Sequence, residues 1–253
     1  MNTIQKVYDK IPIFWINLGN SEDRFKKMSD QLADYACNLR VDAVDGRDPK
    51  QFVTNNQVTY TNHKNFTTAT IAVICSHIKA IKKGYDMEYD MICVCEDDAN
   101  FELIKYYPYT LREIIDKSPS DWDVIQLYHT EKLLEQLGDY QKVGLKVFKR
   151  DSIYSGTCYL INRKGMKKIL TEIVDTDGEK TFHIKVPIKS PEDVIFSYVN
   201  TYVLNLPFIY YYGETMTFDR YTNNAKDYKI CCQKIQLDAK NVLIDFLKNK
   251  IKK

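Results

Sequence analysis

Continuous apolar runs alternate with amphipathic stretches along the first part of the chain. Residues 11–18 are almost entirely apolar, which is typical of a strand in a sheet covered on both faces. Asn20 or Ser21 can then cap a helix that reaches about Tyr35. Residues 39–44 predict a short second strand, closed by the turn signal Asp45-Gly46-Arg47-Asp48-Pro49. The order strand, helix, strand is typical of an α/β protein.

The middle of the chain contains the clearest local patterns. Apolar residues recur at helical spacing from Thr68 to Lys83 and predict a helix, and Gly84 occupies a position where helices commonly end. Residues 91–95 are apolar and β-prone, so they predict a short buried strand. This strand is followed directly by Glu96-Asp97-Asp98, which we call the acidic triplet.

The second half of the chain continues the alternation of strands and helices. We place strands at 124–127, 153–161 and 203–212, and helices at 164–174 and 191–200. The polar segment from His129 to Asp151 is expected to form a hairpin-like insertion, and residues 51–68 a mobile surface loop. Without a repeat or a linker rich in Pro or Gly, the pattern predicts one domain over residues 1–253.

The tail from about 225 to 253 is predicted to be an amphipathic basic helix. Its apolar residues recur along one side of a helix that carries many lysines. Such a helix can lie on an anionic membrane surface as a peripheral contact, or it can pack against its own domain. We favour packing, because it is the more common use of a single apolar stripe.

Composition narrows the possible partners and the compartment. The net charge is +2, from 36 basic and 34 acidic residues, so no overall field attracts nucleic acid. The seven cysteines lack the spacing of a zinc ribbon or a disulfide scaffold, which favours a reducing compartment. The first apolar run is too short to span a bilayer, and no signal peptide precedes it. We therefore expect a cytoplasmic protein that does not bind nucleic acid.

The acidic triplet is the strongest candidate for chemistry. Adjacent carboxylates at the end of a buried strand repel one another, so a cation is expected beside them. Mg²⁺ and Mn²⁺ prefer oxygen ligands and commonly bind one or two carboxylates together with substrate phosphates. If the segment is extended, Glu96 and Asp98 point to one side and Asp97 to the other. A solvated acidic turn without a metal is an equally good interpretation of these residues alone.

A series of short segments along most of the chain resembles glycosyltransferase family 25, which contains lipopolysaccharide-type glycosyltransferases and collagen β-galactosyltransferases. The matching segments are Ile16-Asn17-Leu18 with Asp23-Arg24, Ala43-Val44-Asp45-Gly46, Cys75-Ser76-His77, the acidic triplet, and Gly156-Thr157-Cys158-Tyr159-Leu160-Ile161. The resemblance implies a GT-A type fold, in which helices flank a Rossmann-like mixed sheet in a single domain. It also implies an inverting transfer of galactose or glucose from a UDP-sugar to a glycan, glycolipid or protein hydroxyl.

The resemblance assigns roles to particular residues. Asp98 is the first choice as a ligand of Mn²⁺ or Mg²⁺, and Glu96 the second, although Glu96 stands where many relatives of this fold have Asp. The expected donor-binding residues are Asn17, Asp23, Arg24, Asp45, Ser76, His77, Glu96 and Asp97. The expected acceptor or sugar pocket contains Gly156, Thr157 and Tyr159. From the residues alone, Arg24 fits an ordinary salt bridge equally well, and His77 fits a structural role.

Inversion requires a base near the acceptor. Asp193 is the leading candidate, since it precedes an apolar helix late in the chain, although it also suits a helix N-terminus without any catalytic role. Glu214 is the reserve candidate, and Asp219 or His183 could complete a metal shell. Two other classes of function stay open at this point: a divalent-metal phosphodiesterase or nuclease, and a catalytically silent binding module with the same fold.

Overall fold

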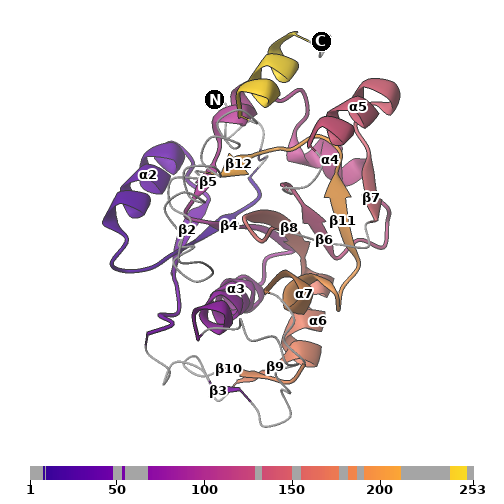
Figure 1. Ribbon diagram of the computed structural model, residues 1–253. Helices are drawn as coiled ribbons and strands as arrows, with labels where there is room; N and C mark the ends of the chain where they lie inside the picture. Colours follow the sequence, from indigo (N-terminus) through magenta and orange to yellow (C-terminus); the bar gives the residue numbers. More distant parts are fainter. Residues whose placement is uncertain are drawn as a thin grey trace, which may run out of the picture.

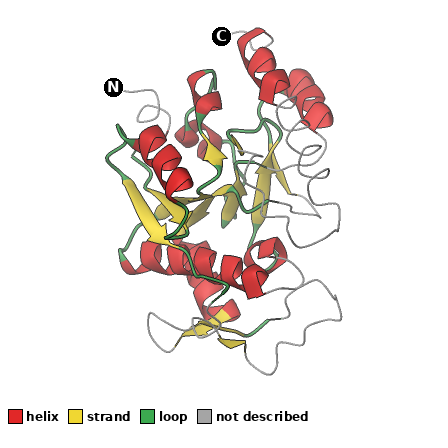
Figure 2. Cartoon of the chain, turned by 60° about the vertical axis from the view of Figure 1, so that its left-hand side comes forward, coloured by secondary structure: helices red, strands yellow, loops and turns green. Residues whose placement is uncertain are grey.

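The structure is a computed structural model of the full chain, in which two helical layers enclose a central sheet (Figures 1 and 2). It describes residues 8, 10–47, 53–54, 68–128, 133–149, 155–176, 182–186, 191–211 and 240–249. The expected fold class is confirmed: the chain forms a mixed α/β sheet flanked by helices.

The central sheet has seven strands in the order β2-β1-β4-β8-β6-β11-β7. They are β1 (Ile13–Asn17), β2 (Asn38–Asp42), β4 (Met91–Glu96), β6 (Val124–Gln126), β7 (Val147–Lys149), β8 (Cys158–Asn162) and β11 (Thr201–Leu204). Strands β2, β1 and β4 are parallel to one another, whereas β8 runs antiparallel to both β4 and β6. The carboxyl ends of β1, β2 and β4 therefore meet at one edge of the sheet.

Each face of the sheet is covered by its own set of helices. One face carries α3 (Thr68–Asp86), α6 (Arg163–Lys168) with the π-helix Ile169–Ile173, and α7 (Pro191–Phe196). The other face carries α2 (Glu22–Leu32), η2 (Glu102–Lys105), α4 (Leu111–Asp116) and α5 (Leu133–Val143). We call the core between the sheet and α3 the first core, and the core on the opposite face, under α2, the second core. Because side chains alternate along a strand, Phe14 and Ile16 of β1 enter the first core, and Ile13 and Trp15 enter the second.

Two smaller sheets complete the fold. Strands β3 (Val53–Thr54), β10 (Phe182–Ile184) and β9 (Val174–Thr176) lie beyond α3, on the side away from the central sheet (Figure 1). Strand β5 (Ala99–Asn100) follows the acidic triplet directly along the chain. It pairs antiparallel with β12 (Tyr210–Tyr211).

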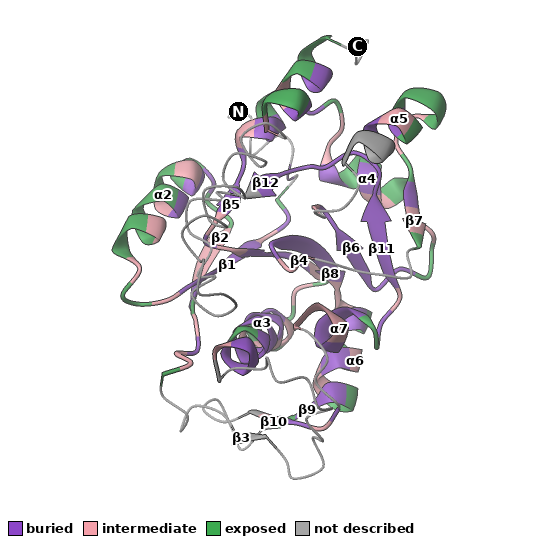
Figure 3. Ribbon diagram, viewed as in Figure 1, coloured by how far each residue is buried: buried purple, intermediate pink, exposed green. Residues whose placement is uncertain are grey.

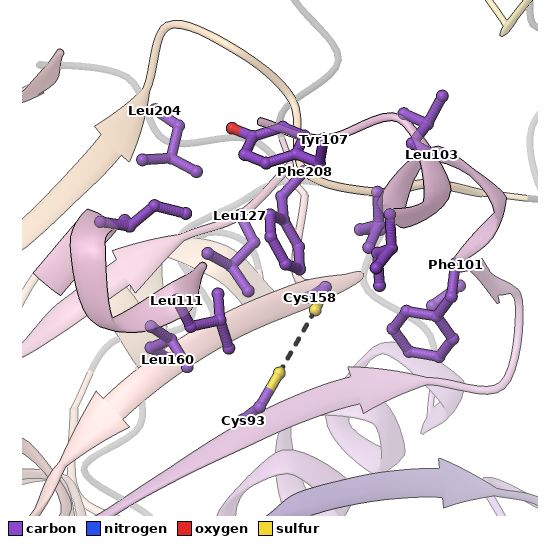
Figure 4. Packing of buried hydrophobic residues seen from close by; sticks show 14 of the residues in the cluster. Cys93, Phe101, Leu103, Tyr107, Leu111, Leu127, Cys158, Leu160, Leu204 and Phe208 are labelled. Carbon is purple, nitrogen blue, oxygen red and sulfur yellow. Dashed lines mark hydrogen bonds between the residues drawn. The ribbon is translucent and has the colours of Figure 1, made fainter. Parts of the chain in front are cut away.

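The middle strands are apolar because both of their faces are covered, one by each core. Figure 3 shows that the central strands are buried along their length. Figure 4 shows side chains from β4, β8, β11, η2, α4 and the segments after β6 and β11 packed together, with Cys93 and Cys158 side by side. Their sulfur atoms lie 3.5 Å apart, and both residues are completely buried.

Most of the predicted strands are confirmed, but the hairpin expected from His129 to Asp151 is wrong. Residues 133–143 form α5, whose buried Leu137 and Tyr140 face the second core. The Tyr140 ring packs edge-on against Phe246, with 5.8 Å between the centroids. The apolar stripe of this helix finds its partner in a segment more than a hundred residues away, which local pattern does not indicate.

Gly84 does not end its helix, contrary to the prediction. Helix α3 continues to Asp86, and a Cβ added at Gly84 would lie 2.6 Å from Cδ1 of Ile92. Gly84 therefore allows α3 to approach β4 closely. Likewise α7 ends at Phe196 rather than at residue 200.

The described part of the C-terminal tail, residues 240–249, is a helix that packs against its own domain. Leu243, Phe246 and Leu247 are buried in the second core. Nζ of Lys240 lies 2.7 Å from Oε2 of Glu102, and Nζ of Lys248 lies 4.6 Å from the centroid of the Tyr106 ring. A membrane contact stays a prediction, and in this segment it cannot use the buried apolar side. No helix within the described ranges is long and apolar enough to cross a bilayer.

Candidate functional site

A cavity of about 640 Å³ opens where the carboxyl ends of β1, β2 and β4 meet. It is bounded by residues after β1, by residues 43–47 after β2, by the first half of α3, and by the end of β4. Ligands of open α/β sheets bind in such a position, beyond the carboxyl ends of parallel strands. The cavity brings together Arg24, Asp45, Ser76, His77, Glu96 and Asp97.

Asp97 is held by two residues from the first part of the chain. Asn17 donates from Nδ2 to Oδ2 of Asp97 at 2.7 Å, and Arg24 donates from its guanidinium to Oδ1 at 3.0 Å. Arg40 on β2 in turn donates from Nε to Oδ1 of Asn17 at 3.1 Å. Each oxygen of Asp97 thus has a partner, and the network joins the ends of β1, β2, β4 and α2.

Glu96 is held from the other side of the cavity. Oε1 of Glu96 lies 3.1 Å from Nε2 of His77, and Nδ1 of His77 lies 3.1 Å from the hydroxyl of Tyr159. His77 and Tyr159 are buried, whereas the side chain of Glu96 is 31% exposed and faces the cavity. A Cβ added at Gly156 would lie 3.3 Å from Oε1 of Glu96, so the backbone there packs directly against this carboxylate.

Asp98 differs from its two neighbours in that one of its carboxylate oxygens lacks a partner. Its Oδ1 is buried and accepts no hydrogen bond within the described part of the chain. Burial, followed by the charges of Glu96 and Asp97, raises the pKa of Asp98 well above its usual value of 3.8, and the smaller opposing effect of Arg24 does not cancel this. Burial and the two neighbouring carboxylates therefore both disfavour the ionised form of Asp98.

The extended geometry expected for the triplet is wrong. Strand β4 ends at Glu96, and residues 97 and 98 form a turn, so Glu96 and Asp97 both line the cavity while Asp98 does not. Within the described ranges, no three side chains of His, Cys, Asp or Glu come together as a ready-made metal site.

The comparison with known families decides the class of protein. The family model described as "Glycosyltransferase family 25 (LPS biosynthesis protein)" matches residues 10–179. The chain belongs to glycosyltransferase family 25. Comparison with curated proteins found no match. The family favours glycosyl transfer over the phosphodiesterase or nuclease chemistry that the carboxylates alone leave open.

The matched residues of this family 25 glycosyltransferase include the cavity but not the candidate base and metal ligands late in the chain. Asn17, the acidic triplet and residues 156–159 lie within 10–179, whereas His183, Asp193, Glu214 and Asp219 lie beyond it. The roles of these four residues therefore depend on the structure or on experiment, and Glu214 and Asp219 lie outside the described residues.

Ser76 supports the cavity wall. Its hydroxyl accepts from the backbone N–H of Val44 at 2.8 Å and donates to the carbonyl of Ala72 at 2.6 Å. A Cβ added at Gly46 would lie 2.7 Å from Cα of Ala69, so residues 43–47 press against the first turn of α3. The hydroxyl of Ser76 is therefore already engaged in fixing this segment.

Asp45 lies at the rim of the cavity and is paired with Arg47. Nε of Arg47 donates to Oδ1 of Asp45 at 2.8 Å, and the backbone N–H of Arg47 donates to the same oxygen at 3.0 Å. These hydrogen bonds lower the pKa of Asp45 from 3.8 to about 2. Asp45 therefore carries its charge throughout the neutral range.

Residues 155–157 lie directly beside Glu96. Ser155 adopts a positive φ of 89° and donates from Oγ to Oγ1 of Thr157 at 2.9 Å. The carbonyl of Thr157 accepts from the N–H of Glu96 at 2.9 Å, which places Gly156 beside the carboxylate. Thr157 and Tyr159 are buried, and the acceptor or sugar pocket expected at Gly156, Thr157 and Tyr159 stays a prediction.

Three other candidates lie away from the lining of the cavity. Asp23 is exposed in the first turn of α2. His183 belongs to β10, in the small sheet beyond α3, where it pairs with Asp175 and Val53. Asp193 lies on α7, which packs against α3.

Two arginines of the site were not predicted. Arg40 anchors Asn17, and Arg47 pairs with Asp45 at the rim of the cavity. Arg47 follows Asp45 by two residues within the turn after β2, and this spacing could have indicated the pair. Arg40 carries no local signal, because its partner lies on the neighbouring strand.

Proposed function

We propose that this glycosyltransferase takes a hexose, galactose or glucose, from a UDP-sugar bound in the cavity, with Mn²⁺ or Mg²⁺ held at the acidic triplet. The observation that supports the proposal most strongly is Oδ1 of Asp98, a buried oxygen without a partner beside two further carboxylates. Natural proteins rarely bury such an atom without a ligand, water or functional reason. A volume of about 640 Å³ is also ordinary for a small-molecule site.

The triplet offers carboxylate oxygens, which a hard divalent cation prefers, and donor phosphates would have to supply further ligands because the described residues do not gather three protein ligands. Asp98 is the first candidate ligand because its Oδ1 accepts no hydrogen bond within the described ranges. Glu96 is the second because His77 contacts only its Oε1 in the described structure. Asp97 is less suited, since Asn17 and Arg24 already engage both of its oxygens. A bound cation would offset the charge that develops on the departing diphosphate.

The chain's own residues would orient the donor. Arg24 lines the cavity with its side chain 24% exposed, and a guanidinium in this place suits a phosphate oxygen of the donor. The segment 43–47 is held rigidly by Ser76, so its backbone offers a fixed surface to the nucleoside. Holding donor and acceptor in line can supply up to roughly 7–11 kcal/mol of the barrier reduction in well-oriented systems.

We propose an inverting reaction in which a carboxylate takes the proton of the acceptor hydroxyl. Asp193 is the first candidate for this base and Glu214 the reserve. The only structural support for Asp193 is its place on α7. Phe196 of this helix packs edge-on against Tyr159, with 5.1 Å between the ring centroids, which brings α7 close to the residues behind the cavity. The acceptor is a hydroxyl of a glycan, glycolipid or protein.

The test is a panel of nucleotide sugars with and without Mn²⁺, scored by thermal shift and by slow donor hydrolysis. A UDP-hexose that stabilises the protein only with Mn²⁺, and is slowly hydrolysed, supports the proposal. Asp98→Asn should abolish both effects, whereas the control Asp86→Asn, an exposed carboxylate at the far end of α3, should leave both unchanged. Binding without hydrolysis by the wild type would instead indicate a silent binding module.

A further inference from the structure

Glu96 is linked through His77 to a hydroxyl that does not line the cavity. The two contacts of the His77 ring are equal in length, 3.1 Å from Nε2 to Oε1 of Glu96 and 3.1 Å from Nδ1 to the hydroxyl of Tyr159. Tyr159 is completely buried and His77 is 1% exposed. The three side chains come from β4, α3 and β8, so tertiary packing alone brings them together.

Which of these atoms can donate a hydrogen bond, and which can only accept one, decides where the protons lie along these contacts. An ionised carboxylate only accepts, so Nε2 of His77 must carry the proton that it gives to Glu96. In a neutral ring, Nδ1 is then the acceptor, and the hydroxyl of Tyr159 donates to it. The opposite tautomer would set a nitrogen lone pair against Oε1. A charged ring would leave the hydroxyl hydrogen of Tyr159 without an acceptor among the described residues.

Packing holds the ring in this orientation. The His77 and Tyr159 rings are stacked, with 5.8 Å between centroids and 26° between planes. Antiparallel pairing places Tyr159 opposite Val94, two residues before Glu96. On the other side, the ring lies beside Gly156, where an added Cβ would stand 3.4 Å from Nε2, at ordinary van der Waals contact.

We propose that Tyr159 is a positioning residue, whose hydroxyl fixes the orientation and tautomer of His77 so that Nε2–H anchors Oε1 of Glu96 in the cavity. The second oxygen of Glu96 is thereby presented to the ligand. This inference rests on the proposed function for the ligand at Glu96, but the anchoring itself can be measured without any turnover. Outer hydrogen-bond partners of this kind typically change metal affinity or activity by roughly 10–100-fold.

The first measurement is the ¹⁵N spectrum of the histidine rings at neutral pH. The chain has four histidines, and the His77 signals are those missing in His77→Gln. We expect the Nε2–H tautomer in the wild type. In Tyr159→Phe, which keeps the ring but removes the hydroxyl, the Nδ1 signal should move to that of a free acceptor, and the Nε2 proton should exchange faster with solvent.

Tyr107→Phe is the matched control. It also removes a buried hydroxyl, one that donates to the carbonyl of Leu206 at 2.7 Å, but it lies in the second core among residues that do not line the cavity (Figure 4). Both variants lose a hydrogen bond, so a purely structural role would affect them alike. Only Tyr159→Phe should change the His77 signals and weaken Mn²⁺-dependent UDP binding, by roughly tenfold.

A wild-type proton on Nδ1, or unchanged His77 signals in Tyr159→Phe, would overturn the anchoring. Changed signals with undiminished Mn²⁺ and UDP affinity would overturn the positioning role. If the wild type binds no UDP, the proposed function fails, and the ring signals alone then support or refute the anchoring by Tyr159.

Discussion

Asp98→Asn is expected to stabilise the ligand-free protein while removing its response to Mn²⁺ and UDP. Oδ1 of Asp98 is buried without a partner, and Glu96 and Asp97 add like charge beside it. A buried polar group without a partner costs about 1–3 kcal/mol, and more when it is charged. The neutral amide avoids the charged part of this cost. In a chain of this size each kcal/mol corresponds to about 2–4 °C in Tm.

The effect should depend on pH in a defined direction. The pKa of Asp98 is raised in the folded state, so the folded chain holds this proton more tightly than the unfolded chain does. The stability contributed by the protonated carboxyl is complete below the ordinary value of 3.8 and is lost as pH rises through the folded-state pKa. The advantage of Asp98→Asn should therefore be absent in acid and grow as the pH is raised.

With Mn²⁺ and UDP bound, the wild type should become more stable than Asp98→Asn. A ligand at a hundred times its Kd stabilises the folded state by about 2.7 kcal/mol. The wild type should gain this amount from Mn²⁺ with UDP, and Asp98→Asn should gain nothing. Tm is measured across pH for both proteins and for Asp86→Asn, with and without the ligands. A variant that is less stable than the wild type at neutral pH, or that gains equally from Mn²⁺ and UDP, would refute the reasoning.

Three further substitutions test the site. Asp193→Asn should keep donor affinity and slow transfer by roughly 10²–10⁴-fold in a coupled assay; loss of donor affinity would contradict its role as base. Arg24→Ala removes the 3.0 Å contact with Asp97 and should lower the unfolding free energy in urea by about 1–3 kcal/mol, and an unchanged value would show that the contact contributes nothing. Gly46→Ala places a Cβ 2.7 Å from Cα of Ala69 and should cost about 1–3 kcal/mol, whereas Gly19→Ala meets nothing within 4 Å and serves as the control.

Local periodicity was sufficient for much of the fold. The apolar runs of β1 and β4, the short strand pattern of β2 and the helical spacing of α3 predicted these elements within a few residues. Strands and helices repeat their burial over short distances, so local pattern is enough to find them. The hairpin at 129–151 failed because the apolar face of α5 is decided by its contact with Phe246. Gly84 was misread for the same reason, since its small size serves the contact with Ile92.

The sequence by itself determined that three carboxylates follow a buried strand, and parallel pairing of β1, β2 and β4 then places two of them, Glu96 and Asp97, at the cavity. Only the tertiary structure decided how they differ. Asp97 is paired with Arg24, 73 residues away, and Glu96 is anchored through His77 to Tyr159, 82 residues from that histidine. Oδ1 of Asp98 is buried and accepts no hydrogen bond within the described ranges. Residue type sets which charges are present, but their pairing depends on distances that only the folded chain defines.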